Sequence, residues 1–288
     1  MKETDDNDAY HADKSRIGKS GLDLIHKSPL HYWAKYLDPN RQWETQSPAL
    51  LMGSVNHMLL FEPQLFASKY ITCDDTEICA QIGGKAPRST KAYKEWYAEF
   101  EAINKGKTVI EKEMLDTALA MRASVYEHPA AHVLLESGIA EERLDFLWEG
   151  TDDDGNPIQV PCKAKPDWRS HNGFIVDLKT TEDASPEGFG KSFFNYRYHV
   201  QAAFYMDAYT RWSGGEEARG FIFIAVEKKP PFATAVYYTT AEQFQLGREE
   251  YEADLRTYHK ALTTGKWNGY PTEVMPMQMP AWAFKKNR

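Results

Sequence analysis

Apolar residues recur at helical spacing through most of the first 138 residues of the chain. Two helix starts carry the same signal, Ser28-Pro29 and Ser47-Pro48, in which a favourable N-cap residue precedes a proline at the first helical position. Another helix start lies at Ser89-Thr90, and a further helical pattern over 111–128 ends before Pro129. We therefore predict that this part of the chain is mostly α-helical.

The pattern changes near residue 140, where the apolar runs become short and are separated by turn residues. Three strands are expected first, and because short turn-rich stretches join them, we predict that they form a meander. A helix, two more strands and a final helix follow. The expected strands are 143–150, 158–169, 173–181, 219–229 and 233–240, and the expected helices are 196–212 and 241–262.

This order of elements predicts one α/β domain rather than two independent ones. We expect a single folded unit over 16–265, with a helical part at 16–138 and a β-rich core at 139–265. Residues 1–15 are polar and acidic, and we expect them to be disordered. The Pro- and Met-rich stretch 266–288 is expected to form a weakly ordered C-terminal tail.

Composition favours a globular, intracellular protein. Of the 288 residues, 42% are hydrophobic, which is enough to bury a substantial core. No apolar run approaches the length of a membrane span, and the polar N-terminus is unlike a signal peptide. The three cysteines, Cys73, Cys79 and Cys162, form no CxxC pair, and we expect free thiols in a reducing compartment.

The formal net charge of -8 argues against a protein that coats nucleic acid through bulk positive charge. It does not exclude a nuclease, because such an enzyme concentrates carboxylates to hold metal and can confine its basic residues to the surface that faces DNA. The arrangement of the charged residues therefore matters more than their sum.

Two carboxylates and a lysine stand near the ends of neighbouring predicted strands. Asp167 closes one strand, and Asp177 and Lys179 lie near the end of the next, two residues apart and so on one face. Such a group suits Mg²⁺ or Mn²⁺, and the lysine could orient water or stabilise charge on a phosphate. An Asp-x-Lys pair is also common by chance at a solvated strand edge. Here the apolar run 174–176 precedes it, where charges are costly unless they are used.

Two helical segments could add to this group. His57 lies in an apolar helix one turn after Gly53, which would permit close approach of the backbone. Gln201 and Tyr205 lie at i and i+4 on the helix that follows the strands, where they could touch a phosphate or the lysine. Taken alone, His57 is more often a structural residue than a ligand, and the Gln201 and Tyr205 pair is an ordinary one.

Two other motifs are set aside. Gly18-Lys19-Ser20 is similar to the end of a phosphate-binding P-loop, but Asp13 stands where the first glycine should be and no buried strand precedes it. The segment 152–155 lacks the alternating ligands and the distal glutamate of a calcium loop, and it predicts a hairpin turn. We expect neither ATP nor calcium to bind at these segments.

Taken in order, the segments GSVNH, KPD, DLK and QAAFY resemble the motifs of the RecB-type branch of the PD-(D/E)XK nuclease superfamily. The residues around them resemble the exonuclease domain of RecE, exodeoxyribonuclease VIII, and its phage relatives. The resemblance extends over residues 20–209, most of the chain. It implies a PD-(D/E)XK nuclease core, in which helices flank a mixed central sheet, with a helical N-terminal elaboration.

The resemblance also implies roles for individual residues. The metal ligands would be His57, Asp167, Asp177 and the backbone carbonyl of Leu178. The catalytic residues would be Lys179, Asp167, Asp177, Gln201 and Tyr205. The implied cofactor is Mg²⁺, for which Mn²⁺ can substitute, with two ions per site. No motif position departs from the pattern, so nothing predicts an inactive enzyme.

For function, the resemblance implies 5′-to-3′ degradation of one strand of linear double-stranded DNA, which leaves a 3′ single-stranded tail for phage-type homologous recombination. It further implies a ring-shaped homotetramer, a single-strand annealing recombinase as partner, and a cytoplasmic location in a bacterial host, from a phage or prophage. Two alternatives stay open. One is another nuclease of the superfamily that acts on single strands or DNA ends, and the other is a non-catalytic scaffold that binds DNA ends.

Basic residues near the motifs are candidates for DNA contacts. Lys163 and Lys165 share the strand periodicity of Asp167, and several others are close to the motifs in sequence. The alternative for each residue is an ordinary solvated surface. The full set of candidates is Lys163, Lys165, Arg169, Lys191, Arg197, His199 and, more loosely, Arg88 with its neighbours Lys85 and Lys91.

Overall fold

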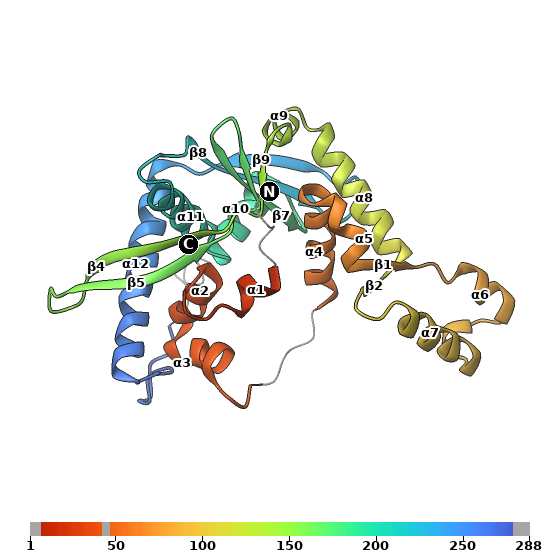
Figure 1. Cartoon of the computed structure of the whole chain (residues 1–288), viewed down its shortest axis with the longest axis horizontal. Helices are drawn as coiled ribbons and strands as arrows, with labels where there is room; N and C mark the ends of the chain where they lie inside the picture. Colours follow the sequence, from red (N-terminus) through yellow and green to blue (C-terminus); the bar gives the residue numbers. More distant parts are fainter. Residues whose placement is uncertain (1–6, 42–46, 279–288) are drawn as a thin grey trace, which may run out of the picture.

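A central β-sheet with helices on both faces organises the protein (Figure 1). The computed structural model describes residues 7–41 and 47–278. Within these ranges, no helix combines the length and the apolar character needed to cross a membrane.

The central sheet has five strands in the order β3-β6-β7-β8-β9. β7 and β8 run parallel, paired from Phe174↔Gly220 to Thr181↔Glu227, and all other neighbours are antiparallel. The parallel pair requires a crossover, which α10 and α11 supply. The bounds are β3 (Gly138–Ala140), β6 (Trp168–Ser170), β7 (Phe174–Thr181), β8 (Gly220–Glu227), β9 (Thr234–Tyr238), α10 (Pro186–Asn195) and α11 (Tyr198–Trp212). The predicted α/β class with a mixed sheet is confirmed.

Helices cover both faces of this sheet because β7 and β8 are apolar on both sides. On one face, Ile175 and Phe223 pack with residues of α11 and α12 (Ala241–Thr264). On the other face, Val176 and Ile224 pack with residues of α4 (Pro48–Phe61), α8 (Lys112–Glu127) and α9 (Pro129–Leu135). The end of β7 is therefore held between α4 and α11.

The predicted three-stranded meander is wrong. β4 (Leu144–Thr151) and β5 (Pro157–Ala164) form a separate antiparallel hairpin that projects from the body, and the short strand β6 joins the central sheet instead (Figure 1). The run 158–169 is interrupted at Lys165-Pro166, because proline lacks the N–H that strand pairing needs. The segment 152–155 forms the hairpin turn, as predicted.

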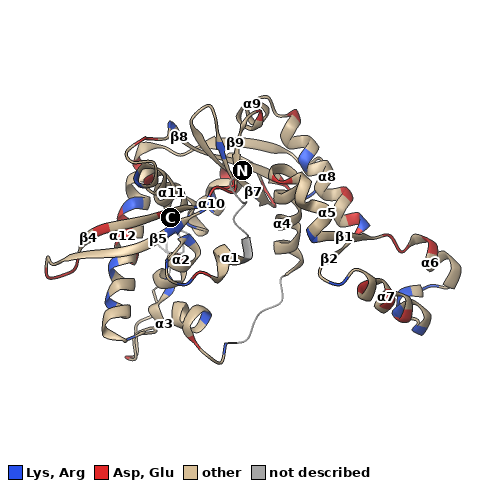
Figure 2. Cartoon of the chain, viewed as in Figure 1, with Lys and Arg blue, Asp and Glu red and all other residues tan. Residues whose placement is uncertain are grey.

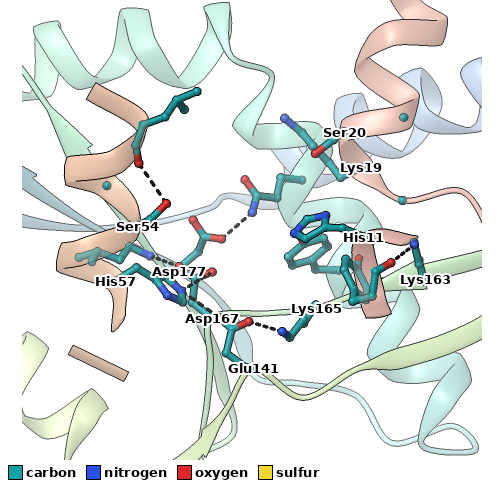
Figure 3. Close-up of a pocket in the computed structure, with 18 of the residues that line it drawn as sticks. His11, Lys19, Ser20, Ser54, His57, Glu141, Lys163, Lys165, Asp167 and Asp177 are labelled. Carbon is teal, nitrogen blue, oxygen red and sulfur yellow. Dashed lines mark hydrogen bonds and ion pairs between the residues drawn. The ribbon is translucent and has the colours of Figure 1, made fainter. Parts of the chain in front are cut away.

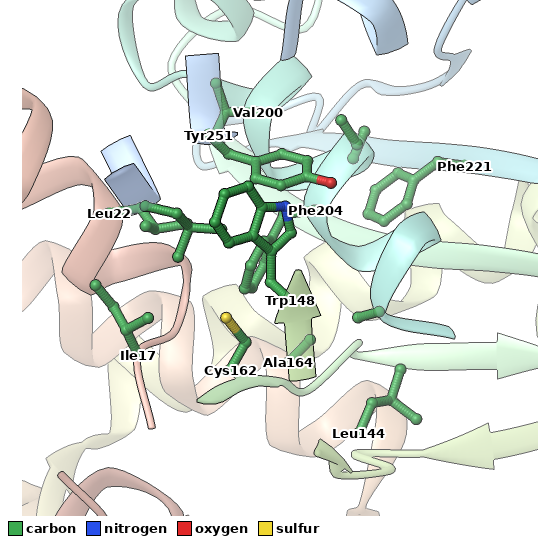
Figure 4. Close-up of a cluster of buried hydrophobic side chains, with 14 of the residues drawn as sticks. Ile17, Leu22, Leu144, Trp148, Cys162, Ala164, Val200, Phe204, Phe221 and Tyr251 are labelled. Carbon is green, nitrogen blue, oxygen red and sulfur yellow. The ribbon is translucent and has the colours of Figure 1, made fainter. Parts of the chain in front are cut away.

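An aromatic cluster anchors the hairpin to the body (Figure 4). Trp148 of β4, Phe204 of α11 and Tyr251 of α12 are all buried in it. The Phe204 ring lies 5.3 Å from that of Phe146 and 5.4 Å from that of Tyr251. Burial of side chains of this size typically stabilises a fold by roughly 1.5–3 kcal/mol each. The cluster thereby fixes α11, which carries Gln201 and Tyr205.

The helical N-terminal part is confirmed. Ser47 and Thr90 cap their helices as predicted, accepting hydrogen bonds from Leu50 N and Tyr93 N. Two short parallel strands in this part, β1 (Tyr70–Cys73) and β2 (Thr108–Glu111), are not evident from the sequence pattern. The remaining elements here are α2 (Lys19–Lys27), α3 (Pro29–Tyr32), a π-helical turn (Trp33–Leu37), a 3₁₀ turn (Pro63–Leu65) and α5 (Phe66–Lys69).

Residues 74–107 form an arm that projects from β1 and β2 (Figure 1). It contains α6 (Thr76–Ile82), a 3₁₀ turn (Pro87–Ser89) and α7 (Lys91–Ile103), and both acidic and basic residues lie along α7 (Figure 2). Asp75 fixes the base of the arm, because it accepts hydrogen bonds from the Arg88 guanidinium and from the Tyr93 hydroxyl.

The two ends of the described chain pack onto the body. α12 begins at a capping box of Thr240 and Gln243, which confirms the predicted final helix, and Trp267 of the expected tail stacks on Tyr32 at 5.7 Å. Residues 7–12 form α1 (Asn7–Ala12) within the segment expected to be disordered, whereas 1–6 and 279–288 lie outside the described residues. The free thiols are confirmed for Cys73, Cys79 and Cys162.

Candidate active site

Asp167 and Asp177 come together where β6 begins beside the middle of β7. Trp168 of β6 pairs with Val176 of β7 in antiparallel register, so the next pair of positions places Asp167 opposite Asp177. The Leu178 amide donates a hydrogen bond of 2.8 Å to Asp167 Oδ2. The pairing of β6 with β7 therefore brings the two carboxylates together, as the sequence predicted.

Lys179 lies on the same face of β7 as Asp177. Its Nζ is 2.5 Å from Asp177 Oδ1, and Asp177 is only 1% exposed. The other carboxylate oxygen, Oδ2, accepts a hydrogen bond of 2.5 Å from Gln201 Nε2 of α11. The Lys179 ammonium also lies 4.6 Å from the centre of the Tyr198 ring, in a cation–π contact. The strand and the helix therefore fix this pair of charges jointly.

His57 reaches this group from α4 (Figure 3). Its Nε2 lies 3.2 Å from Asp167 Oδ1 and 3.0 Å from Glu141 Oε1. A Cβ atom added at Gly53 would lie 3.7 Å from the Thr180 hydroxyl, so α4 runs directly beside the end of β7. The structure thus places His57 among the motif carboxylates rather than in the apolar core.

Glu141 is a member of this group that the sequence pattern did not reveal. It lies between β3 and β4 with a φ of 52°, and its N–H donates to the Asp167 carbonyl at 3.1 Å. Its second oxygen lies 2.7 Å from Lys165 Nζ. Ligand atoms of His57, Glu141 and Asp167 all lie within 4.8 Å of one another. An acidic pair, Glu141-Glu142, lies near the point where the helical pattern ends. The sequence does not show which of the two side chains points into the site.

Burial and mutual proximity shift the pKa values of these groups. Burial, with the Asp167 carboxylate second, raises the pKa of Asp177 to about 6. Burial alone would raise the pKa of Asp167, but the positive charges of His57 and Lys179 outweigh it and lower that pKa. Burial opposes charge on His57 and Lys179 as well, yet the neighbouring carboxylates dominate and raise both pKa values. Near neutral pH the site is therefore a buried cluster of paired charges.

These residues line a cavity of about 990 Å³ (Figure 3). The N-terminal segment 10–21, which carries Lys19 and Ser20, supplies another part of its wall. Tyr205 lines the same cavity, and burial raises the pKa of its hydroxyl well above the usual value, so the hydroxyl stays protonated. The cavity is lined by eight Lys or Arg residues and five Asp or Glu residues, although the whole chain is acidic. This local excess of positive charge suits a polyanionic ligand.

Lys163 and Lys165, two of the residues predicted to contact DNA, line the cavity but also have partners within the protein. Lys163 Nζ donates hydrogen bonds to the backbone carbonyls of Tyr10 and Asp13, the latter at 2.5 Å. Lys165 Nζ pairs with Glu141. Lys163 thereby fastens the N-terminal segment against the cavity, and contact of either lysine with DNA stays a prediction.

The other candidates for DNA contacts lie outside the cavity. Four of them pair with carboxylates of the protein: Arg169 with Glu142, Arg197 with Asp23, Glu250 and Asp254, His199 with Glu250, and Arg88 with Asp75. Lys191 is exposed on α10, and Lys85 and Lys91 are exposed on the arm. Their contacts with DNA also stay predictions.

The donor set fits a divalent metal ion. Carboxylate oxygens are the ligands that Mg²⁺ and Mn²⁺ prefer, and imidazole is a common metal ligand. Asp177 Oδ1 forms an ion pair with Lys179, but it receives no hydrogen bond of good geometry from the residues that the structure describes. A buried carboxylate oxygen normally finds such a partner, and a metal ion would supply one.

Comparison with known proteins identifies the family of this chain. Residues 18–275 match the family described as a PDDEXK-like domain of unknown function (DUF3799), whereas no curated protein matches. Among solved structures, a candidate exonuclease from Eubacterium rectale has a TM-score of 0.61 at 14% identity, covering 100% of this chain and 98% of that one. A phage-related exonuclease from Haemophilus somnus has a TM-score of 0.32 at 11% identity, with 69% and 99% covered.

The family match spans most of the chain, and the Eubacterium rectale protein shares its fold. The expected PD-(D/E)XK core and the nuclease class of enzyme are therefore confirmed, while the narrower likeness to RecE stays a prediction. This chain belongs to the PDDEXK-like DUF3799 family and is an enzyme of the nuclease class.

Proposed function

We propose that this protein is a divalent-metal-dependent exonuclease that degrades one strand of linear double-stranded DNA from its 5′ end. The observation that carries the proposal is the meeting of Asp167, Asp177 and Lys179 at the central strand β7 of the sheet. They line a cavity that is more basic than the rest of the chain. Carboxylates that can bind metal and basic side chains that can bind phosphate thus lie in one cavity, as phosphodiester hydrolysis requires.

Mg²⁺, or Mn²⁺ in its place, would be held by ligands from three elements, and we propose two ions per site. The ligands would be His57, Asp167, Asp177 and the backbone carbonyl of Leu178, and Glu141, which lies close to His57 and Asp167, would join them. When bound, the metal supplies Lewis-acid stabilisation of phosphate charge and a water molecule of lowered pKa.

The protein's own residues position the reacting groups. Lys179 keeps its proton beside the carboxylates, so it can donate a hydrogen bond to a phosphate oxygen on which negative charge develops. Gln201 holds Asp177 in one orientation through its hydrogen bond. Tyr205 stays protonated and can donate to a phosphate oxygen or to water.

The choice of an exonuclease rests on likeness. The Eubacterium rectale protein of the same fold is described as a candidate exonuclease, and the motifs of this chain resemble those of RecE. On the same basis we propose a ring-shaped homotetramer that leaves 3′ single-stranded tails for phage-type homologous recombination. Its partner would be a single-strand annealing recombinase in the cytoplasm of a bacterial host.

Digestion of labelled DNA tests this proposal. Linear duplex carrying a label on the 5′ or the 3′ end is incubated with the protein, with Mg²⁺ or with EDTA. We expect Mg²⁺-dependent release of short 5′-labelled products, while the 3′-labelled strand shortens progressively and circular duplex stays intact. Asp177→Asn is the inactive control, because it removes a charged ligand and keeps the shape of the side chain.

The open alternatives give different results in the same assay. Faster digestion of single strands than of linear duplex would identify a nuclease of the superfamily with another substrate. Binding of DNA ends with neither cleavage nor Mn²⁺ binding would identify a scaffold. Wild-type activity in Asp177→Asn would contradict the proposed site itself.

A further inference from the structure

One exposed aromatic side chain, Tyr196, lines the catalytic cavity, and a second, Phe194, lies two residues earlier in the chain. Phe194, at the end of α10, is 66% exposed, and Tyr196, in the turn before α11, is 62% exposed. The Phe194 ring lies parallel to that of His199, with centroids 6.1 Å apart. Single exposed aromatic residues are ordinary on protein surfaces, but these two lie within three residues of each other and one of them lines a cavity. Tyr196 itself lines that cavity.

Tyr196 stands where the catalytic cavity meets a second, smaller hollow of about 170 Å³. Residues 180–183 after the catalytic motif and residues of α10 line this smaller hollow. Four residues line both spaces: Thr180, Tyr196, Tyr198 and Lys228. A DNA strand that occupies the catalytic cavity and continues into the smaller hollow would therefore pass Tyr196.

A chain of ring contacts links Tyr196 to the catalytic lysine. The rings of Tyr196 and Tyr198 lie 5.7 Å apart at an angle of 31°. The Tyr198 ring in turn lies 4.6 Å from the Lys179 ammonium. These two contacts together span at most about 10 Å, about three times the roughly 3.4 Å between successive stacked bases, so a base stacked on Tyr196 would lie within about three nucleotides of a phosphate at Lys179.

The backbone that carries Tyr196 is held firmly. Its N–H donates to the Ser192 carbonyl, and its carbonyl accepts a hydrogen bond of 2.9 Å from Lys19 Nζ. The next residue, Arg197, has a φ of 54°, in the region that favours glycine. Its guanidinium pairs with three carboxylates, those of Asp23, Glu250 and Asp254. The sequence suggested Arg197 as a DNA contact, whereas in the structure its ion pairs hold the backbone next to Tyr196 in place.

We propose that Tyr196 is a base-stacking residue for the DNA strand that enters the cavity, with Phe194 extending the apolar rim. This inference rests on the proposed function and adds the feature that is recognised, an unpaired base within about three nucleotides of the phosphate at Lys179. Stacking on an aromatic ring suits an enzyme without sequence preference, because every base has a π-face. An aromatic side chain also presents a large area at low cost in conformational entropy.

Fluorescence of 2-aminopurine, which falls when this base stacks on an aromatic ring, tests the proposal. The probe is placed at successive positions near the end of a short duplex with a single-stranded overhang, and Ca²⁺ replaces Mg²⁺. A gel confirms that the DNA stays intact. Wild-type protein should quench the probe at one or two positions, and Tyr196→Ala should lose the quenching and bind the DNA about tenfold more weakly. Tyr196→Trp should restore both.

Tyr238→Ala is the matched control, because Tyr238 is 74% exposed and lines neither hollow. It should behave as the wild type. Unchanged quenching in Tyr196→Ala would overturn the inference. The inference would also be overturned if Tyr196→Ala sedimented as a smaller assembly while quenching stayed intact. The exposed aromatic rings would then form a contact between subunits. Failure of the proposed function is a separate result, since it requires wild-type protein that does not digest DNA with Mg²⁺.

Discussion

The Gln201 amide donates a hydrogen bond of 2.5 Å to Asp177 Oδ2, and this contact joins α11 to the sheet at the centre of the candidate active site. It leaves the other oxygen of the same carboxylate beside Lys179. Because Asp177 is 1% exposed, bulk water cannot replace the hydrogen bond that Gln201 donates to it. The amide therefore selects one orientation of the carboxylate.

Replacing Gln201 with leucine should lower kcat roughly 10- to 100-fold without unfolding the protein, because losing a partner that orients a metal ligand typically has an effect of that size. Initial rates on linear duplex with Mg²⁺ measure it, and a thermal melt checks the fold. Gln245→Leu, at an exposed position of α12, is the control. Equal rates for Gln201→Leu and wild type would show that Asp177 needs no such partner.

Lys179→Gln and Asp177→Asn should separate charge stabilisation from metal binding. Lys179→Gln should lower kcat about 10²- to 10³-fold, the usual cost of removing a donor that meets developing charge. It should keep Mn²⁺ binding, since Lys179 is not a ligand. Asp177→Asn should lose both catalytic activity and Mn²⁺ binding. Calorimetric titration with Mn²⁺ beside the rate assay gives the comparison, and loss of Mn²⁺ binding in Lys179→Gln would refute this division of tasks.

Glu141→Gln should weaken Mn²⁺ binding roughly 10- to 100-fold, because Glu141 contacts His57 and its carboxylate oxygen lies within 4.8 Å of the ligand atoms of His57 and Asp167. Glu142→Gln is a matched control one residue away, since Glu142 pairs with Arg169 outside the cavity. Calorimetric titration measures both variants. Equal Mn²⁺ affinities in the two variants would exclude Glu141 from the metal site.

Metal binding should release protons, and metal affinity should rise with pH. Neighbouring carboxylates raise the pKa of His57 well above its usual value, so the metal-free ring is protonated near neutral pH and must lose a proton to bind metal. Burial raises the pKa of Asp177 to about 6, so protons also compete there as the pH falls through 6. Titrations in buffers of different ionisation enthalpy count the released protons. Affinity that is constant from pH 5 to 8 would contradict this prediction.

Asp75 should stabilise the arm at neutral pH and lose this effect in acid. Hydrogen bonds from Arg88 lower the pKa of Asp75 to about 2. A folded-state pKa below the unfolded value means that the contribution is present above about pH 4 and is lost as the pH falls toward 2.

Asp75→Ala should therefore cost about 1 kcal/mol at pH 7, because the buried Tyr93 hydroxyl loses its partner. Hydrogen exchange across 74–107 measures the loss at pH 7 and at pH 3, where the difference from wild type should shrink. Glu77→Ala, at an exposed position of α6, controls for the loss of a charge. A difference that is equal at both pH values would show that ionisation of Asp75 is not the cause.

The elements with strong local signals could be predicted from the sequence. Ser47 and Thr90 stand at helix starts where the cap is a local contact, β8 is apolar along almost its whole length, and β7 begins with the apolar run 174–176. Strand periodicity placed Asp177 and Lys179 on one face of β7, whereas their roles came from the resemblance. The separate β4-β5 hairpin could not be predicted, because its departure from the sheet depends on one break at Lys165-Pro166 and on packing against α11.

Contacts between residues far apart in the sequence could not be predicted either, because they depend on how distant segments pack. Glu141 enters the site only because its backbone adopts a left-handed conformation and pairs with the Asp167 carbonyl. The roles suggested for Arg197 and His199 assumed an open surface, whereas α12 brings carboxylates to both residues. A single sequence shows which residues are basic, but not which acids fold against them.

Lys163 reaches the backbone of Asp13, which lies 150 residues earlier in the chain. Contacts of such separation form slowly, since the entropy of closing a long loop opposes them until the partners meet. The cavity therefore closes only when both halves of the chain are present and folded. A proteolytic fragment that lacks the N-terminal segment would therefore keep Asp167, Asp177 and Lys179 but lose the part of the cavity wall that residues 10–21 supply.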